Sequence, residues 1–170
     1  LSSSSAASDV YKRQALVDAF TRLAEATGEA RWIHRACDVA DTMLDHFWDT
    51  DNGGLFTTAD DAEQLVVRQK DLLDNATPSA NSMAIVALDR LAELTGEMRY
   101  RNLAEQILLL IGGLMDNTPS GFSHAFWAVQ SRLHGSTEVA VVGDRPDLVA
   151  AVFEQWRPGA VLAWGEPYSS

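Results

Sequence analysis

The feature that most constrains this chain is an internal repeat. Residues 22–32 read RLAEATGEARW and residues 90–100 read RLAELTGEMRY, so the two copies differ at three positions. In both copies a Thr-Gly pair follows an apolar-periodic segment, and a glycine just past the last turn is a common way for a helix to end. A second amphipathic segment follows each pair, so the repeat predicts two helical hairpins. One hairpin cannot bury its apolar face alone, and we therefore expect an array or ring of stacked hairpins.

Apolar residues at helical spacing define the individual helices. The first helix is expected from Ala15 onward, with Leu16, Phe20, Leu23 and Ala24 as its apolar stripe. Further helices are expected over residues 33–47, from near Pro78 or Ser79 to about residue 95, over 100–111 and over 120–135. Residues 15–135 are thus predicted to form one unit of about two and a half helical hairpins.

The two ends of the chain differ from this unit. Residues 1–14, LSSSSAASDVYKRQ, resemble a translated sequencing adapter, and we predict that they are a non-native leader. Residues 136–170 read as a β-α-β segment, with apolar strands over 137–143 and 160–164 and a helix over 146–156. A single glycine after the first of these strands falls short of a dinucleotide-binding motif, so no cofactor is expected.

Composition and charge exclude several classes of partner. The net charge is −11, and clustered Lys and Arg are what binding to nucleic acid or anionic lipid requires, so neither partner is expected. No apolar run approaches the roughly 20 residues of a membrane-spanning helix. Cys37 is the one cysteine, which rules out an internal disulfide and favours a cytoplasmic protein.

The most polar stretch of the chain, residues 68–82, reads RQKDLLDNATPSANS. It lies between helical segments, and we expect a loop that runs into a helix near Pro78 or Ser79, with Asp74 or Thr77 as its cap. Loops on rigid scaffolds are where binding groups concentrate. A solvated turn with an ion pair and a helix cap explains the same residues equally well, so both interpretations stay open.

The chain also resembles a known family. The likeness rests on FWDTDNGGLF at 47–56, RQKD at 68–71, the pattern D-x-A-x-P-S-x-N-S at 74–82, and EVAVVG at 138–143. These motifs are similar to those of the thioredoxin-domain family that includes spermatogenesis-associated protein 20, over about residues 15–170. Ala80 stands where that family usually has glycine.

The resemblance implies a fold and two partners. The family has an N-terminal thioredoxin-like domain followed by an α/α toroid similar to six-hairpin glycosidases and N-acylglucosamine 2-epimerases. We therefore expect a mainly α fold: a partial α/α toroid of helical hairpins with a small C-terminal β-α-β segment. The implied partners are a small-molecule carbohydrate and, within the same protein, the missing thioredoxin-like domain and the remaining hairpins.

Two functions are open at this stage. In the first, carboxylates at the mouth of the hairpin ring perform acid/base chemistry on a sugar. In the second, the hairpins are a non-catalytic scaffold for the thioredoxin-like domain or a protein partner. No metal is expected, because the D-x-D turn at Asp49 lacks the later ligands of a calcium loop. For the first function, the expected catalytic residues are Asp71, Asp74 and Lys70, and the expected substrate-binding residues are Arg68, Ser79, Asn81 and Phe56.

Overall fold

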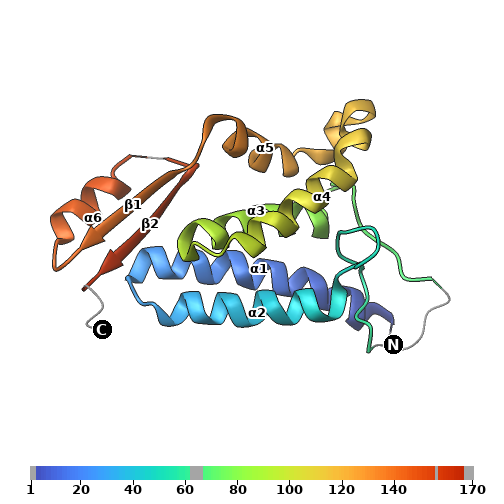
Figure 1. Cartoon of the computed structure of the whole chain (residues 1–170), viewed down its shortest axis with the longest axis horizontal. Coiled ribbons are helices and arrows are strands. Elements are labelled where there is room, and N and C mark those ends of the chain that lie inside the picture. Colours follow the sequence, from blue (N-terminus) through green and yellow to red (C-terminus); the bar gives the residue numbers. More distant parts are fainter. Residues whose placement is uncertain (1–2, 62–66, 156, 167–170) are drawn as a thin grey trace.

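Two helical hairpins form the centre of the molecule (Figure 1). The computed structural model describes residues 3–61, 67–155 and 157–166. Its first hairpin consists of α1 (Ser3–Thr27) and α2 (Arg31–Phe47), and its second of α3 (Ala80–Thr95) and α4 (Met98–Asn117). Between the hairpins, residues 48–61 and 67–79 run over one end of the helices (Figure 1).

The sequence repeat makes the same turn in both hairpins. Gly28 and Gly96 adopt left-handed φ values of +70° and +73°, and each glycine N–H donates to the carbonyl four residues earlier at 2.8 Å. The hydroxyls of Thr27 and Thr95 likewise donate to the carbonyl four residues earlier, at 2.7 Å. A non-glycine residue is strained at such φ values, which explains why both copies keep glycine here. The predicted hairpins are confirmed.

The first helix of each hairpin lies in an inner layer. A short 3₁₀ helix, η1 (Pro119–Phe122), leads into α5 (Ala125–His134), which packs on α3 as α3 packs on α1. The partners α2 and α4 cover α1 and α3 from outside, and Arg132 of α5 makes a two-pronged ion pair with Asp89 of α3 at 2.7 and 3.0 Å. This layering is that of a partial α/α toroid, as expected. The central helix α3 supplies the fully buried core residues Ala84, Ile85, Leu88 and Leu91.

The predicted β-α-β tail is also present. Strands β1 (Thr137–Val142) and β2 (Ala160–Gly165) pair in parallel, with α6 (Pro146–Phe153) as the crossover. The helix ends at Phe153, three residues before the predicted end, and Trp156 lies outside the described residues.

Glu25 of α1 fastens this tail to the hairpins. Its Oε1 accepts the Leu162 N–H at 2.8 Å, its carbonyl accepts the Trp164 indole N–H at 2.5 Å, and its Oε2 pairs with Arg90 of α3. The Glu25 and Arg90 side chains are only 11% and 12% exposed. One carboxylate therefore joins α1, α3 and β2.

The predicted apolar stripe of α1 is wrong in part. Leu16 and Leu23 are 43% and 38% exposed, whereas the buried face runs through Val10, Gln14, Val17, Thr21 and Ala24. The reason is geometric: α2 and α3 pack on the side that carries two polar residues, and the leucines lie on the opposite side.

Within the described residues, no helix is long and apolar enough to cross a membrane.

Residues of the predicted leader are part of α1. Val10 is 1% exposed, Gln14 is fully buried, and the Tyr11 hydroxyl donates to the Pro78 carbonyl at 2.6 Å. Among the described residues, neither the amide nitrogen nor the amide oxygen of Gln14 has a hydrogen-bond partner. The non-native origin of residues 1–14 stays a prediction, but Gln14 is an unfavourable residue for the place it occupies.

We predict that Gln14→Leu stabilises the protein. The substitution removes a buried amide without partners and keeps most of the side-chain volume, so the free energy of unfolding should rise by about 1–3 kcal/mol. Chemical denaturation measures the change. Gln130→Leu, at an exposed position of α5, is the matched control and should change it by no more than about 0.5 kcal/mol. A loss of stability in Gln14→Leu would contradict the described packing of α1.

We also predict that Glu25→Ala loosens the tail. The change removes the acceptor of the Leu162 N–H and leaves the buried Arg90 guanidinium unpaired, which should cost about 3 kcal/mol. Burial already lowers the pKa of Arg90 to about 10. Relative to the wild-type protein, Glu25→Ala should speed backbone hydrogen exchange in β1 and β2 more than in α4. Glu154→Ala, an exposed position after α6, should leave exchange unchanged, and equal protection of β2 in both variants would refute the role of Glu25.

Candidate functional site

Residues 68–82 contact all three inner helices: α3 and α5 at their starts, and α1 along its first half. Asp74 is the main connection: its Oδ1 accepts the Ser79 N–H ahead of α3, and its Oδ2 accepts the His124 N–H ahead of α5, both at 2.8 Å. The Asp74 N–H donates to the Gly121 carbonyl at 2.7 Å, and Tyr11 of α1 reaches Pro78. The predicted loop therefore lies at the end of the inner helices where α3 and α5 begin.

The first turn of α3 differs from the prediction in its cap. The helix begins at Ala80, and the Ser79 hydroxyl accepts the Ser82 N–H at 3.1 Å, so Ser79 is the N-cap in place of Asp74 or Thr77. Pro78 lies outside the helix. The Ser79 hydroxyl also contacts the Ser82 hydroxyl at 3.0 Å. Ser79 as a whole is 1% exposed. Its polar atoms are therefore used by the protein.

Asn81 is fully buried and binds the preceding loops. Its Oδ1 accepts the Leu55 N–H at 2.7 Å, and its Nδ2 donates to the carbonyls of Leu55 and Asp71 at 3.0 and 2.8 Å. Gly54, at φ +80°, permits this approach, because a Cβ there would lie 3.1 Å from the Asn81 amide oxygen and 2.8 Å from Leu110. The predicted sugar-binding groups Ser79 and Asn81 thus both bind backbone.

The predicted orienting cations face away from Asp71 and Asp74. Lys70 pairs with Asp49 at 2.7 Å and donates to the Gly53 carbonyl. Its ammonium group, followed by the backbone N–H groups of the turn, holds the pKa of the Asp49 carboxyl well below its usual range. Among the described residues Lys70 makes no ion pair with either predicted catalytic carboxylate.

Phe56 is covered by two cations. The Arg68 guanidinium carbon lies 4.2 Å from the ring centroid and the Lys70 ammonium nitrogen lies 5.2 Å from it. Arg68 also donates to the carbonyls of Thr58 and His46, the latter at 2.9 Å. The Phe56 ring, Arg68 and Lys70 thus hold residues 55–61 and 67–70 against the end of α2.

Asp71 differs from the other predicted residues in its remaining capacity to accept hydrogen bonds. Its Oδ2 accepts the Ala80 N–H at a long 3.4 Å, and within the described part of the chain its Oδ1 has no hydrogen-bond partner. The residue is half-buried. Of the two predicted catalytic carboxylates, Asp71 therefore has the greater remaining capacity to accept hydrogen bonds.

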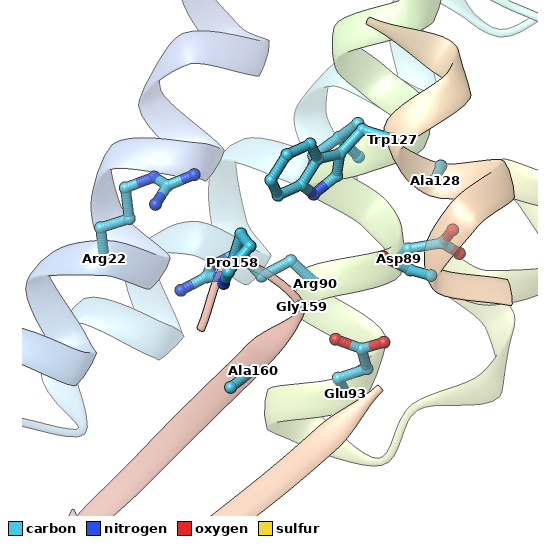
Figure 2. A pocket seen from close by; sticks show the side chains of 11 residues that line it. Arg22, Asp89, Arg90, Glu93, Trp127, Ala128, Pro158, Gly159 and Ala160 are labelled. Atoms are coloured by element: carbon cyan, nitrogen blue, oxygen red, sulfur yellow. The ribbon is translucent and has the colours of Figure 1, made fainter. Parts of the chain in front are cut away.

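A small hollow lies between the inner helices on the side of the tail (Figure 2). Its lining comes from α1, α3 and α5 and from residues 158–160, which lead into β2, and its volume is about 40 Å³. A water molecule needs about 10–15 Å³ by this measure, so the hollow holds a few waters and no sugar ring. Burial raises the pKa of Glu93 in its wall. Arg90 and Asp89 are already paired with Glu25 and Arg132.

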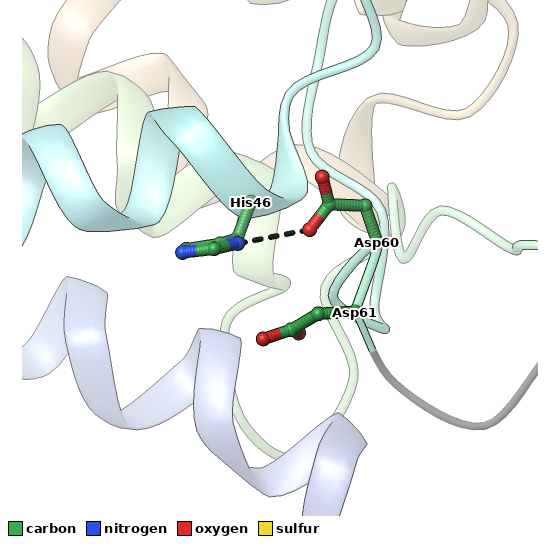
Figure 3. Close-up of side chains that lie close together, drawn as sticks. All are labelled: His46, Asp60 and Asp61. Atoms are coloured by element: carbon green, nitrogen blue, oxygen red, sulfur yellow. Dashed lines mark hydrogen bonds and ion pairs between the residues drawn. The ribbon is translucent and has the colours of Figure 1, made fainter.

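Sequence reasoning missed one further cluster. His46, Asp60 and Asp61 lie close together at the end of α2 (Figure 3). Their spacing in the sequence carries no motif, and only the fold of residues 48–61 brings them together.

Comparison with known proteins agrees with this architecture. The profile of the N-acylglucosamine 2-epimerase family matches residues 14–127. The chain is 31% identical over 155 residues to spermatogenesis-associated protein 20 of Homo sapiens and 30% identical to that of Rattus norvegicus, in each case over 86% of this chain and 20% of the relative. The chain thus spans about a fifth of the length of these curated relatives. With a family profile that matches from the second half of α1 into α5, the chain belongs to the N-acylglucosamine 2-epimerase family.

Proposed function

We propose that these hairpins are part of an α/α toroid that binds a sugar and performs acid/base chemistry on it. The observation that carries the proposal is the position of Asp71: it lies in the loop where Asp74 joins the starts of α3 and α5, and among the described residues its Oδ1 has no hydrogen-bond partner. The name of the matched family, N-acylglucosamine 2-epimerase, points to an N-acylated hexosamine as the first sugar to test.

The two carboxylates have different roles in this proposal. Asp71 is the acid/base residue that contacts the sugar, since it has the capacity for a further hydrogen bond. Asp74 is a positioning residue, because both of its oxygens already accept backbone N–H groups. The loop that carries Asp71 is fixed by Ser79 and Asn81. The neighbouring part of the loop is held by the stacking of Arg68 on Phe56 and by the ion pair of Lys70 with Asp49.

A second function has an observation of its own. The polar atoms of Ser79, Asn81 and Asp74 all bind other parts of this chain, as in a loop built for rigidity. A scaffold that supports a thioredoxin-like domain or a protein partner would need no more than this. The two functions differ in whether Asp71 contacts a small molecule.

The test compares two isosteric substitutions in the whole protein. Asp71→Asn should lower sugar turnover by roughly a hundredfold or more, the usual effect of losing a general acid or base. Its free energy of unfolding should change by no more than about 1 kcal/mol. Asp74→Asn should instead lower stability by about 1–3 kcal/mol, because an amide nitrogen then faces a backbone N–H.

Proton NMR of N-acetylglucosamine and of unmodified hexoses detects both binding and conversion. Asp116→Asn, an exposed position of α4, is the control and should change neither turnover nor stability. Full turnover in Asp71→Asn would refute the catalytic role. Absence of any sugar binding to the wild-type protein would favour the scaffold.

A further inference from the structure

His46, Asp60 and Asp61 present three metal-ligating side chains to one point (Figure 3). Each offers a nitrogen or oxygen atom, and the three atoms lie within 4.8 Å of one another. His46 Nδ1 and Asp60 Oδ1 are 2.8 Å apart. We propose that these residues bind a divalent transition-metal ion, with Zn²⁺ or Mn²⁺ as the best match.

The spacing suits a single ion. Ligand atoms about 2.0–2.2 Å from a metal lie at most about 4.4 Å from one another, so a small movement of Asp61 brings all three within reach. The imidazole nitrogen and the adjacent carboxylate oxygen already have the separation of neighbouring ligands in an octahedral shell. The dashed contact in Figure 3 is the edge on which the ion would sit.

The backbone holds the ligands in place. The Asp60 N–H donates to the His46 carbonyl at 3.0 Å, and the Arg68 guanidinium donates to the same carbonyl at 2.9 Å. Arg68 also binds the Thr58 carbonyl, two residues before Asp60. These bonds fix the loop against the last turn of α2 whether or not an ion is present, so the site is largely formed in advance.

Ligand chemistry selects the class of metal. An imidazole favours zinc, nickel and copper, whereas carboxylates favour harder ions such as manganese. One imidazole with two carboxylates therefore favours Zn²⁺ and Mn²⁺ over Ca²⁺, which prefers a shell of oxygens.

The surroundings are also suited to a cation. The carbonyl end of α2 carries a partial negative charge, and Asp45 is adjacent to His46. Among the described residues, the positive charge beside the cluster that opposes cation binding is the Arg68 guanidinium, which donates to the His46 carbonyl. His46 and Asp60 side chains are 40% and 57% exposed, which leaves the remaining coordination positions open to water. The site uses neither of the carboxylates proposed for sugar chemistry, so the two proposals stand or fall separately.

The test measures Zn²⁺ and Mn²⁺ binding to the whole protein by isothermal titration calorimetry. The wild-type protein should bind one ion of Zn²⁺ per chain at this site and should bind Ca²⁺ more weakly. His46→Gln and Asp60→Asn should each weaken Zn²⁺ binding at least about tenfold, because each removes a direct ligand.

Two matched variants separate ligation from charge. His34→Gln changes an exposed histidine of the same helix, and Asp45→Asn removes a neighbouring charge without removing a ligand. Both should bind Zn²⁺ within about threefold of the wild-type affinity, the scatter usual for an exposed substitution. Mn²⁺ should broaden the NMR signals of the His46 ring before those of His34.

Zn²⁺ binding that is absent from the wild-type protein, or that His46→Gln and Asp60→Asn both leave intact, would overturn the proposal. A loss in Asp45→Asn equal to that in Asp60→Asn would overturn it as well, since it would reduce the effect to surface charge. Both ligands are on the surface, so neither variant should unfold, and circular dichroism checks that they do not.

Discussion

The carboxamide of Asn81 is the interaction on which the polar end of the molecule depends. A side chain with no exposed surface makes three hydrogen bonds to backbone groups of two loops, at Leu55 and Asp71. Backbone groups of a buried loop have no partners in a helix or strand, so the conformation of these loops depends on such specific polar bonds. By holding both loops against the first turn of α3, Asn81 sets the position of Asp71 and of Phe56.

The same principle joins the larger elements. Asp74 bonds the starts of α3 and α5, Glu25 joins α1, α3 and β2, and Asp89 with Arg132 holds α5 on α3. Each is a charged group with several partners at the boundary between elements. Breaking one member of such a buried group costs more than the pair itself contributes, because it leaves a charge without a partner. The helices supply the apolar core, and these groups determine how the helices are arranged.

Much of this architecture could be predicted from the sequence, because helical periodicity and the Thr-Gly repeat are local signals. The hairpins and the place of the polar loop followed from them, and the β-α-β tail followed from its two short apolar strand segments. The direction of individual side chains did not. Lys70 turns to Asp49, and Gln14 is buried while Leu16 is exposed, because neighbouring helices decide which face is covered. The cluster of His46 with Asp60 required the fold itself, since one residue lies at the end of α2 and the other in the loop that follows.

The buried Asn81 organises residues 68–82 from within, and one substitution tests this dependence. Asn81→Asp keeps the shape and the acceptor for the Leu55 N–H but turns a carboxylate oxygen toward the carbonyls of Leu55 and Asp71. Measured by chemical denaturation, the free energy of unfolding should fall by about 3 kcal/mol or more, as expected for an uncompensated buried charge. Asn102→Asp, at an exposed position of α4, should leave it nearly unchanged. A stability of Asn81→Asp equal to that of the wild-type protein would contradict the account.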